Sequence, residues 1–247
     1  YKRQALSQLN RIDEAASLWL EVAQKARDFD WTLEGINHFD GDVGSRLRHF
    51  FVMEAPLKTP KLSGQIEAYL EAEPRRESET LLKRLYASQP KSLTARRRLV
   101  EFYRQTDAHR KLVDLLQEHT DLDPIELETL ASSSERLGEL DVAEFARSRQ
   151  LQRSPTSQLR AIHASILDRL GRTEDAVDGY IAAARDAELP SAASELFDEA
   201  VRCLGRGSGD SARGFNIALE AAQTLGFDRE RVSALTRFAL TRDDWLR

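Results

Sequence analysis

The chain has 247 residues, a length that suits one large domain or two ordinary ones. Its 34 Leu and 30 Ala far outnumber its 9 Val and 8 Ile, and it has only 7 Pro and 12 Gly. Leu and Ala favour helices, β-branched residues favour strands, and a sandwich or barrel needs many turn residues. The composition therefore predicts an all-α protein.

The charges exclude further classes. With 36 basic and 41 acidic residues the net charge is -5, which gives a mixed surface. Contact with a nucleic-acid backbone favours a basic excess, so we expect no nucleic-acid partner. No apolar run approaches the roughly 18 residues that would span a bilayer, so we expect no membrane contact by this chain. Residue 1 is Tyr rather than Met, which we interpret as a fragment of a longer protein.

Two sequence marks recur with one period. Prolines are spaced by 34, 34, 31 and 35 residues, at Pro56, Pro90, Pro124, Pro155 and Pro190. A Leu-Gly-charged tripeptide recurs at 137–139, 170–172 and 204–206, at spacings of 33 and 34. Because two independent marks share the period, the chain is predicted to consist of repeats of about 34 residues.

Each repeat is predicted to contain two amphipathic helices. Apolar residues recur every three or four positions from 125 to 137 and again from 140 to 151. A glycine such as Gly138 suits the left-handed residue that ends the first helix, and the proline ends the second. Ala143 and Ala176, five residues after their glycines, would let the paired helices approach closely. One such hairpin cannot bury its apolar face alone, so neighbours are expected to stack.

The segment 170–180, with Ala164 before it and Ala183 after it, resembles the tetratricopeptide repeat. The segment 138–155 fits the same pattern, except that Arg147 stands where the family has an aromatic residue. The resemblance implies an all-α, right-handed α-solenoid of antiparallel helical hairpins. It would cover 1–247 as a single solenoid of about seven repeats, the first and last truncated.

One internal stretch departs from the regular repeat, and two further helices are predicted at the C-terminal end. Residues 28–60 are predicted as a divergent repeat with helices over 28–36 and 45–54; the alternative is an irregular boundary between two stacks. Residues 228–240 are predicted as one more first helix, and 243–245 as the start of a truncated one. The whole chain is expected to form about 14 helices and no sheet.

The sequence contains no catalytic or metal-binding pattern. Its histidines lack metal-ligand spacing. The glycine-rich segment 205–210 lacks the strand and the Lys-Ser/Thr pair of a phosphate loop, so we interpret it as a lengthened turn. Cys203 has no activating neighbour in sequence and is interpreted as a structural thiol. We expect no enzyme activity, no cofactor and no metal.

In tetratricopeptide proteins the first helix of each pair lines a concave binding groove. The resemblance therefore implies a partner-binding groove of mixed charge, formed by Arg97, Glu101, Arg104, Glu128, Ser132, Glu135, Arg136, Asp168, Arg169, Glu195, Glu199 and Arg202. Such a groove suits a folded protein or a polar extended segment. The alternative binding surfaces are the convex face and the 28–60 stretch, with Trp31, Phe39 and Phe51 taken as exposed.

The resemblance implies a non-catalytic scaffold for protein–protein interaction. In its style of repeat the chain is also similar to the periplasmic tetratricopeptide regions of bacterial exopolysaccharide exporters of the Pel and cellulose type. That similarity implies a role in biofilm formation, with a polysaccharide-modifying enzyme as partner. The alternative is a helical accessory or regulatory segment of a cytoplasmic enzyme or signalling protein. The compartment stays open, with the periplasm slightly favoured.

Overall fold

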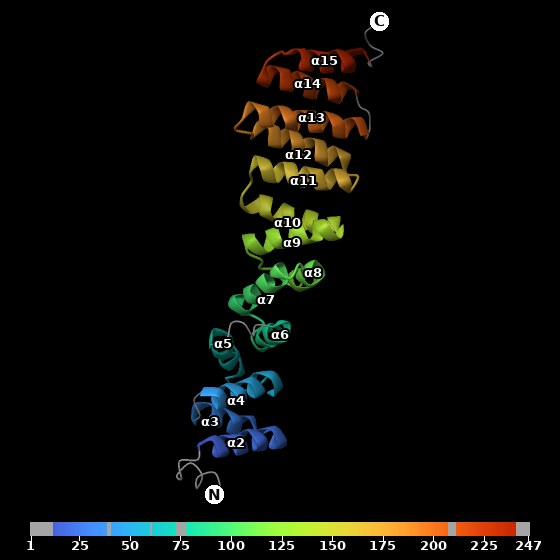
Figure 1. Ribbon diagram of the computed structural model, residues 1–247. Coiled ribbons are helices and arrows are strands. Elements are labelled where there is room, and N and C mark those ends of the chain that lie inside the picture. Colours follow the sequence, from blue (N-terminus) through green and yellow to red (C-terminus); the bar gives the residue numbers. More distant parts are fainter. Residues whose placement is uncertain (1–11, 39–40, 60, 73–77, 207–210, 241–247) are drawn as a thin grey trace. The chain divides into compact units, whose positions relative to one another are not determined.

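The computed structural model describes residues 12–38, 41–59, 61–72, 78–206 and 211–240 (Figure 1). Within these ranges the chain forms 14 α-helices and no strand. The all-α prediction is therefore confirmed.

The chain divides into two compact units, Tyr1–Thr106 and Asp107–Arg247. The first, unit 1, contains α2 (Ile12–Ala26), α3 (Phe29–His38), α4 (Gly41–Glu54), α5 (Leu62–Ala72), α6 (Glu79–Ser88) and α7 (Leu93–Gln105). The second, unit 2, contains α8 (His109–Gln117), α9 (Pro124–Leu137), α10 (Leu140–Arg153), α11 (Ser157–Arg169), α12 (Thr173–Arg185), α13 (Pro190–Arg206), α14 (Ser211–Leu225) and α15 (Arg229–Leu240). One continuous solenoid over 1–247 stays a prediction.

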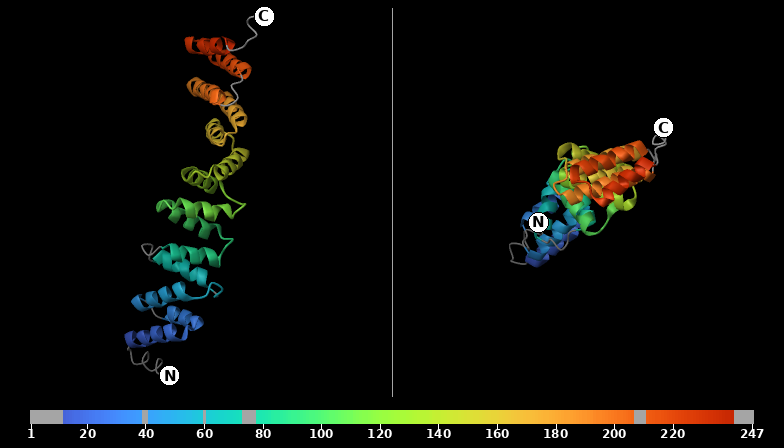
Figure 2. Two further views of the ribbon diagram at one scale, coloured as in Figure 1. Left: turned by 90° about the vertical axis from the view of Figure 1, so that its right-hand side faces the viewer. Right: turned by 90° about the horizontal axis from the view of Figure 1, so that it is seen from above.

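Unit 1 is built by packing helices that follow one another in the chain (Figure 2). Its largest fully buried side chains include Phe51, Ile66 and Tyr69, from α4 and α5. A polar contact also links α4 to α6, because Arg84 Nε donates to the carbonyl oxygen of Val52 at 2.7 Å. Apolar burial thus holds neighbouring helices together, and Arg84 ties two that are not consecutive.

The 28–60 stretch forms two helices, α3 and α4, close to the predicted positions. Its aromatic side chains are more enclosed than expected. Phe51 is fully buried, and Trp31 is half-buried and stacks on Trp19 with the ring centroids 4.5 Å apart. Phe39 lies outside the described residues. The prediction of an exposed aromatic surface is therefore wrong for Phe51, because its ring is needed in the core of unit 1.

Unit 2 continues the pattern of consecutive packing from α8 to α15. Gly138 and Gly171 follow the first helices α9 and α11 with φ of 77° and 75°, as predicted for left-handed helix ends. Gly205 differs, because it lies inside α13 rather than at a turn. The prediction that a turn begins at Gly205 is therefore wrong, because α13 continues to Arg206. The next residues, 207–210, lie outside the described part.

The C-terminal helices follow the prediction in part. The expected first helix over 228–240 is α15, Arg229–Leu240. The truncated helix expected from residue 243 lies outside the described residues.

The alanines after the turns should tolerate no larger residue. Ala143 and Ala176 are fully buried. Replacing either with Leu is expected to overpack its helix pair and lower the free energy of unfolding by about 1–3 kcal/mol. Chemical denaturation monitored by circular dichroism measures the change, and an unchanged midpoint for Ala176→Leu would contradict the packing.

A control for these substitutions must lie free of tertiary contacts. Arg153, a surface residue by its place in the sequence, is unsuitable because its Nη1 donates to the carbonyl oxygen of Leu122 at 2.6 Å. Gln152 is exposed on the same helix. Gln152→Ala should leave stability within about 0.5 kcal/mol of the wild type.

Candidate functional site: the predicted groove residues

The predicted groove residues fall on four helices in two units. Arg97, Glu101 and Arg104 lie on α7 of unit 1. The remainder lie on α9, α11 and α13 of unit 2. Each set is a candidate surface on its own unit.

The set on α7 is an exposed, charged row. All three side chains are exposed, and Arg104 Nε lies 3.4 Å from Glu101 Oε2. An exposed pair of this kind contributes at most about 1 kcal/mol to folding, so these charges can be changed without unfolding the helix. The row is therefore accessible for binding, as the prediction requires.

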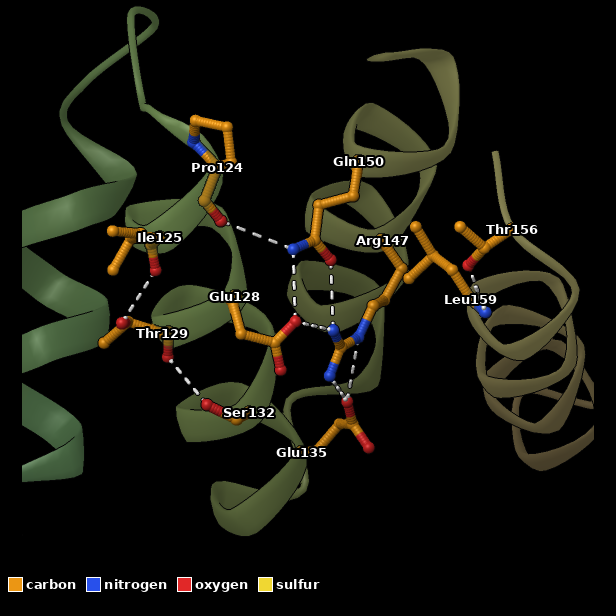
Figure 3. A network of polar contacts seen from close by, with 10 residues as sticks. All are labelled: Pro124, Ile125, Glu128, Thr129, Ser132, Glu135, Arg147, Gln150, Thr156 and Leu159. Atoms are coloured by element: carbon orange, nitrogen blue, oxygen red, sulfur yellow. Dashed lines mark hydrogen bonds and ion pairs between the residues drawn. The ribbon is translucent and has the colours of Figure 1, made fainter. Parts of the chain in front are cut away.

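The set on α9 has a structural role, which centres on Arg147 of α10 (Figure 3). The Arg147 side chain is only 5% exposed, and its Nε and Nη2 donate to Glu135 Oε1 at 3.3 and 3.1 Å. Its Nη1 donates to Glu128 Oε2 and, at 3.0 Å, to Gln150 Oε1. Two groove residues thus serve as counter-charges for a buried guanidinium.

This network gives Glu128 and Glu135 a structural role in addition to their predicted place in a groove. Arg147 is buried between α9 and α10, at the position where the sequence resemblance led us to expect an aromatic side chain. A buried charge needs partners, and the partners are the two carboxylates across the helix pair. The sequence showed that position 147 carries Arg instead of the expected aromatic residue. It did not show which carboxylates would balance the charge of Arg147.

The network also sets the ionisation of Glu128. Burial alone would raise the pKa of this carboxyl group, but hydrogen bonds from Arg147 and Gln150 and the charge of Arg147 outweigh it. The pKa of Glu128 is consequently held below its usual value. The pair is therefore charged throughout the neutral range.

The other two predicted groove residues on α9, Ser132 and Arg136, make single polar contacts within α9 and with α8. Ser132 Oγ donates to the carbonyl oxygen of Thr129 on its own helix at 3.3 Å (Figure 3). Arg136 is exposed, and its Nη1 lies 3.2 Å from Nε2 of His109 on α8. The contacts of these two side chains are hydrogen bonds, and they indicate no further chemical role.

Between α11 and α13 the structure assembles a polar cluster around Asp168. Cys203 Sγ donates to Asp168 Oδ1 at 3.1 Å, and Arg206 of α13 forms an ion pair with the same carboxylate. Sequence reasoning named Asp168 but missed Cys203 and Arg206 as its partners. Their spacings of 35 and 38 residues match about one repeat, which is the signal that could have connected them.

The same cluster makes Cys203 a poor nucleophile. The side chain is fully buried, and burial together with the hydrogen bond to Asp168 and its negative charge raises the pKa of the thiol to about 11. At pH 8 a thiol with this pKa has about a thousandth of its molecules ionised, against about a tenth at an ordinary pKa near 9. This agrees with the interpretation of Cys203 as a structural thiol.

We therefore expect Cys203 in the folded protein to react with Ellman's reagent at pH 8 at least about 100-fold more slowly than in guanidinium chloride. Asp168→Asn should speed the native reaction, because removing the carboxylate lowers the thiol pKa. A native reaction as fast as that of the unfolded chain would contradict the assignment.

The remaining groove residues lie on α11 and α13. Arg169 and Glu195 are exposed and form no ion pair with other described residues, whereas Arg202 Nη2 lies 2.7 Å from Glu199 Oε1. Glu195 and Glu199 also line a hollow of about 930 Å³ between the start of α11, the end of α12 and the start of α13. These two predicted groove residues therefore border a concave surface of unit 2.

The described residues offer neither a metal site nor a membrane-spanning helix. They contain no group of three or more His, Cys, Asp or Glu side chains placed to hold a metal ion. The histidine side chains that the structure describes lie close to polar side chains of the protein. His163 Nε2, for example, lies 3.2 Å from Glu144 Oε1. No helix in the described ranges is long and apolar enough to cross a bilayer.

No protein-family model matches the chain, and no curated protein matches it as a relative. The tetratricopeptide resemblance, the link to exopolysaccharide export and the choice of compartment therefore stay predictions. They depend on the repeat in the sequence.

Proposed function

We propose that the chain is a non-catalytic scaffold for protein–protein interaction, formed by stacked tetratricopeptide-like hairpins of a right-handed α-solenoid. In such a stack each hairpin contacts its neighbours, and the side-by-side helices present an extended surface to a partner.

The observation that supports it is the contact between equivalent helices of successive hairpins in unit 2. The first helices α11 and α13 are joined by the Asp168–Arg206 pair, and α13 and α15 by Arg231 Nη2 donating to Ser194 Oγ at 3.0 Å. The participating residues are 38 and 37 positions apart.

The second helices make corresponding contacts. Arg185 of α12 donates to Glu220 of α14 at 2.6 Å, and Arg213 of α14 donates to Asp178 of α12 at 2.7 Å. Both separations are 35 residues. First helices beside first helices and second beside second, at about one repeat length, are typical of a stack of hairpins rather than of a closed bundle.

If a partner protein binds the charged row of Arg97, Glu101 and Arg104 on α7, reversing the basic charges of this α7 row is expected to weaken that binding. Arg97→Glu combined with Arg104→Glu should weaken the complex at least about 10-fold while leaving helicity unchanged, because both side chains are exposed. The complex would first be isolated from cells that express the chain naturally, then reconstituted and its stoichiometry measured by light scattering.

Lys58→Glu combined with Lys91→Glu changes the charge equally on exposed loop positions and serves as the control. Equal recovery of the partner with both double variants would exclude the α7 row as the binding surface. The scaffold proposal itself would be overturned if no stoichiometric complex formed, or if the chain alone turned over a substrate.

A further inference from the structure

The hollow that Glu195 and Glu199 line in unit 2 has the properties of a docking site. We call it the α11–α13 hollow; it lies between the N-terminal half of α11, the connection from α12 to α13, and the N-terminal half of α13. The hollow is open to solvent and has a volume of about 930 Å³. It is therefore large enough to accept a short segment of another protein.

The charge of the α11–α13 hollow has one sign. Four of its lining residues are acidic, and none is Arg, Lys or His; the acidic ones are Asp186, Glu188, Glu195 and Glu199. Arg160 Nε lies 2.8 Å from Asp186 Oδ2, and Glu199 is paired with Arg202, so these two carboxylates are compensated from outside the lining. Glu188 and Glu195 form no ion pair with other described residues, and they leave the hollow with uncompensated negative charge.

Stabilisation of α13 explains only part of this charge. Glu188 precedes the N-terminus of α13, where the helix dipole favours an anion. Glu195 lies in the second turn, and the dipole effect is limited to the first turn. Among the described residues Glu195 thus has no ion-pair partner, and its exposed carboxylate is available to bind a cation.

An apolar side chain stands beside the carboxylates. Leu189 is 64% exposed, and Leu196, also in the lining, is half-buried. A single exposed leucine is ordinary on a protein surface. Here it borders a concave surface whose lining also includes alanines of α11 and α13, so an apolar side chain of a partner would be buried against it.

We propose that the α11–α13 hollow docks a short segment of a partner protein that carries two or more Lys or Arg side chains next to a large apolar one. The cations would face Glu188 and Glu195, and the apolar side chain would cover Leu189. Opposite charge accelerates the encounter and selects the partner, and apolar burial slows dissociation. This inference rests on the proposed scaffold function and specifies the chemistry of one partner.

The test uses the whole chain and a defined probe. A phage library of random 12-residue peptides is selected on the wild-type protein, and the enriched peptides are synthesised with a fluorescent label for anisotropy titration. We expect the enriched peptides to be basic and to contain Leu, Ile, Phe or Met. Glu188→Lys combined with Glu195→Lys should weaken their binding at least about 10-fold, and Leu189→Ala at least about threefold.

Matched controls separate the site from net charge. Asp114→Lys combined with Glu118→Lys, which we call the α8 double variant, makes the same charge change at exposed positions in α8 and directly after it. Ile125 at 66% exposure matches Leu189. Both the α8 double variant and Ile125→Ala should bind within about twofold of the wild type. Circular dichroism would confirm equal helicity in every variant.

Three outcomes would overturn the proposal: acidic or neutral selected peptides, an equal loss of binding in both double variants, or no selected binder at all. Failure here is distinguishable from failure of the scaffold function. If a native partner forms a stoichiometric complex that Glu188→Lys combined with Glu195→Lys leaves intact, the scaffold stands and the α11–α13 hollow is not its docking site.

Discussion

Replacing Arg147 with Ala is expected to lower the free energy of unfolding by about 2–4 kcal/mol. Removing one partner of a buried ion pair typically costs about 3–5 kcal/mol, because the other partner stays behind uncompensated. Here Glu128 is 54% exposed and can regain water, which reduces the cost, while Glu135 at 26% cannot do so fully. Loss of the buried arginine stem adds a packing term. Urea denaturation monitored by circular dichroism measures the change.

A second substitution separates charge from packing. Arg147→Met keeps most of the stem volume and removes the charge, so its cost relative to the wild type reports on the ion pairs. The pKa of Glu128 is lowered in the folded state, so its contribution is present above the unfolded pKa and is lost as the pH falls through the folded pKa. The difference between wild type and Arg147→Met should therefore shrink between pH 6 and pH 3. A difference that does not change with pH would contradict the role of the network.

The Arg147 network also illustrates what the sequence could predict. The turn at Gly138, the helices on either side of it and the odd residue at position 147 are local features, and each was readable from spacing. The partners Glu128 and Glu135 are 19 and 12 residues away, on a helix whose rotation about its axis the sequence did not determine. The sequence could therefore place the two carboxylates on α9, but it could not show that the neighbouring helix would present a buried guanidinium to them.

Glycines show the same limit. Gly138 and Gly205 are the central residues of two copies of the Leu-Gly-charged tripeptide. Gly138 ends a helix with φ of 77°, whereas Gly205 lies inside one. Local sequence permits both conformations, since glycine has no Cβ, and the longer course of α13 decides between them. Gly179 lies within the 170–180 segment that resembles the tetratricopeptide repeat. Its importance depends on the distance between two helices, which no spacing in the sequence reveals.

Replacing Gly179 with Leu is expected to lower the free energy of unfolding by about 3 kcal/mol. A Cβ built at Gly179 would lie 2.9 Å from the Cβ of Ala164, so α11 and α12 would have to separate. Ala164 Cβ is fixed to the backbone and cannot move aside as the end of a long side chain would. A glycine to alanine change in a helix normally gains about 1 kcal/mol, but overpacking a core typically costs about 1–3 kcal/mol, so the clash should dominate even for Gly179→Ala.

Gly205→Ala provides the matched control, because a Cβ there would meet no atom within 4 Å. That variant should be neutral or slightly more stable than the wild type. A rescue makes the test specific: Ala164→Gly in the Gly179→Ala background moves the single Cβ to the other side of the same crossing. If the crossing limits the packing, the double variant should recover most of the loss, with a coupling of at least about 1 kcal/mol in the double-mutant cycle. Additive effects of the two changes would mean that α11 and α12 are not in contact at this point.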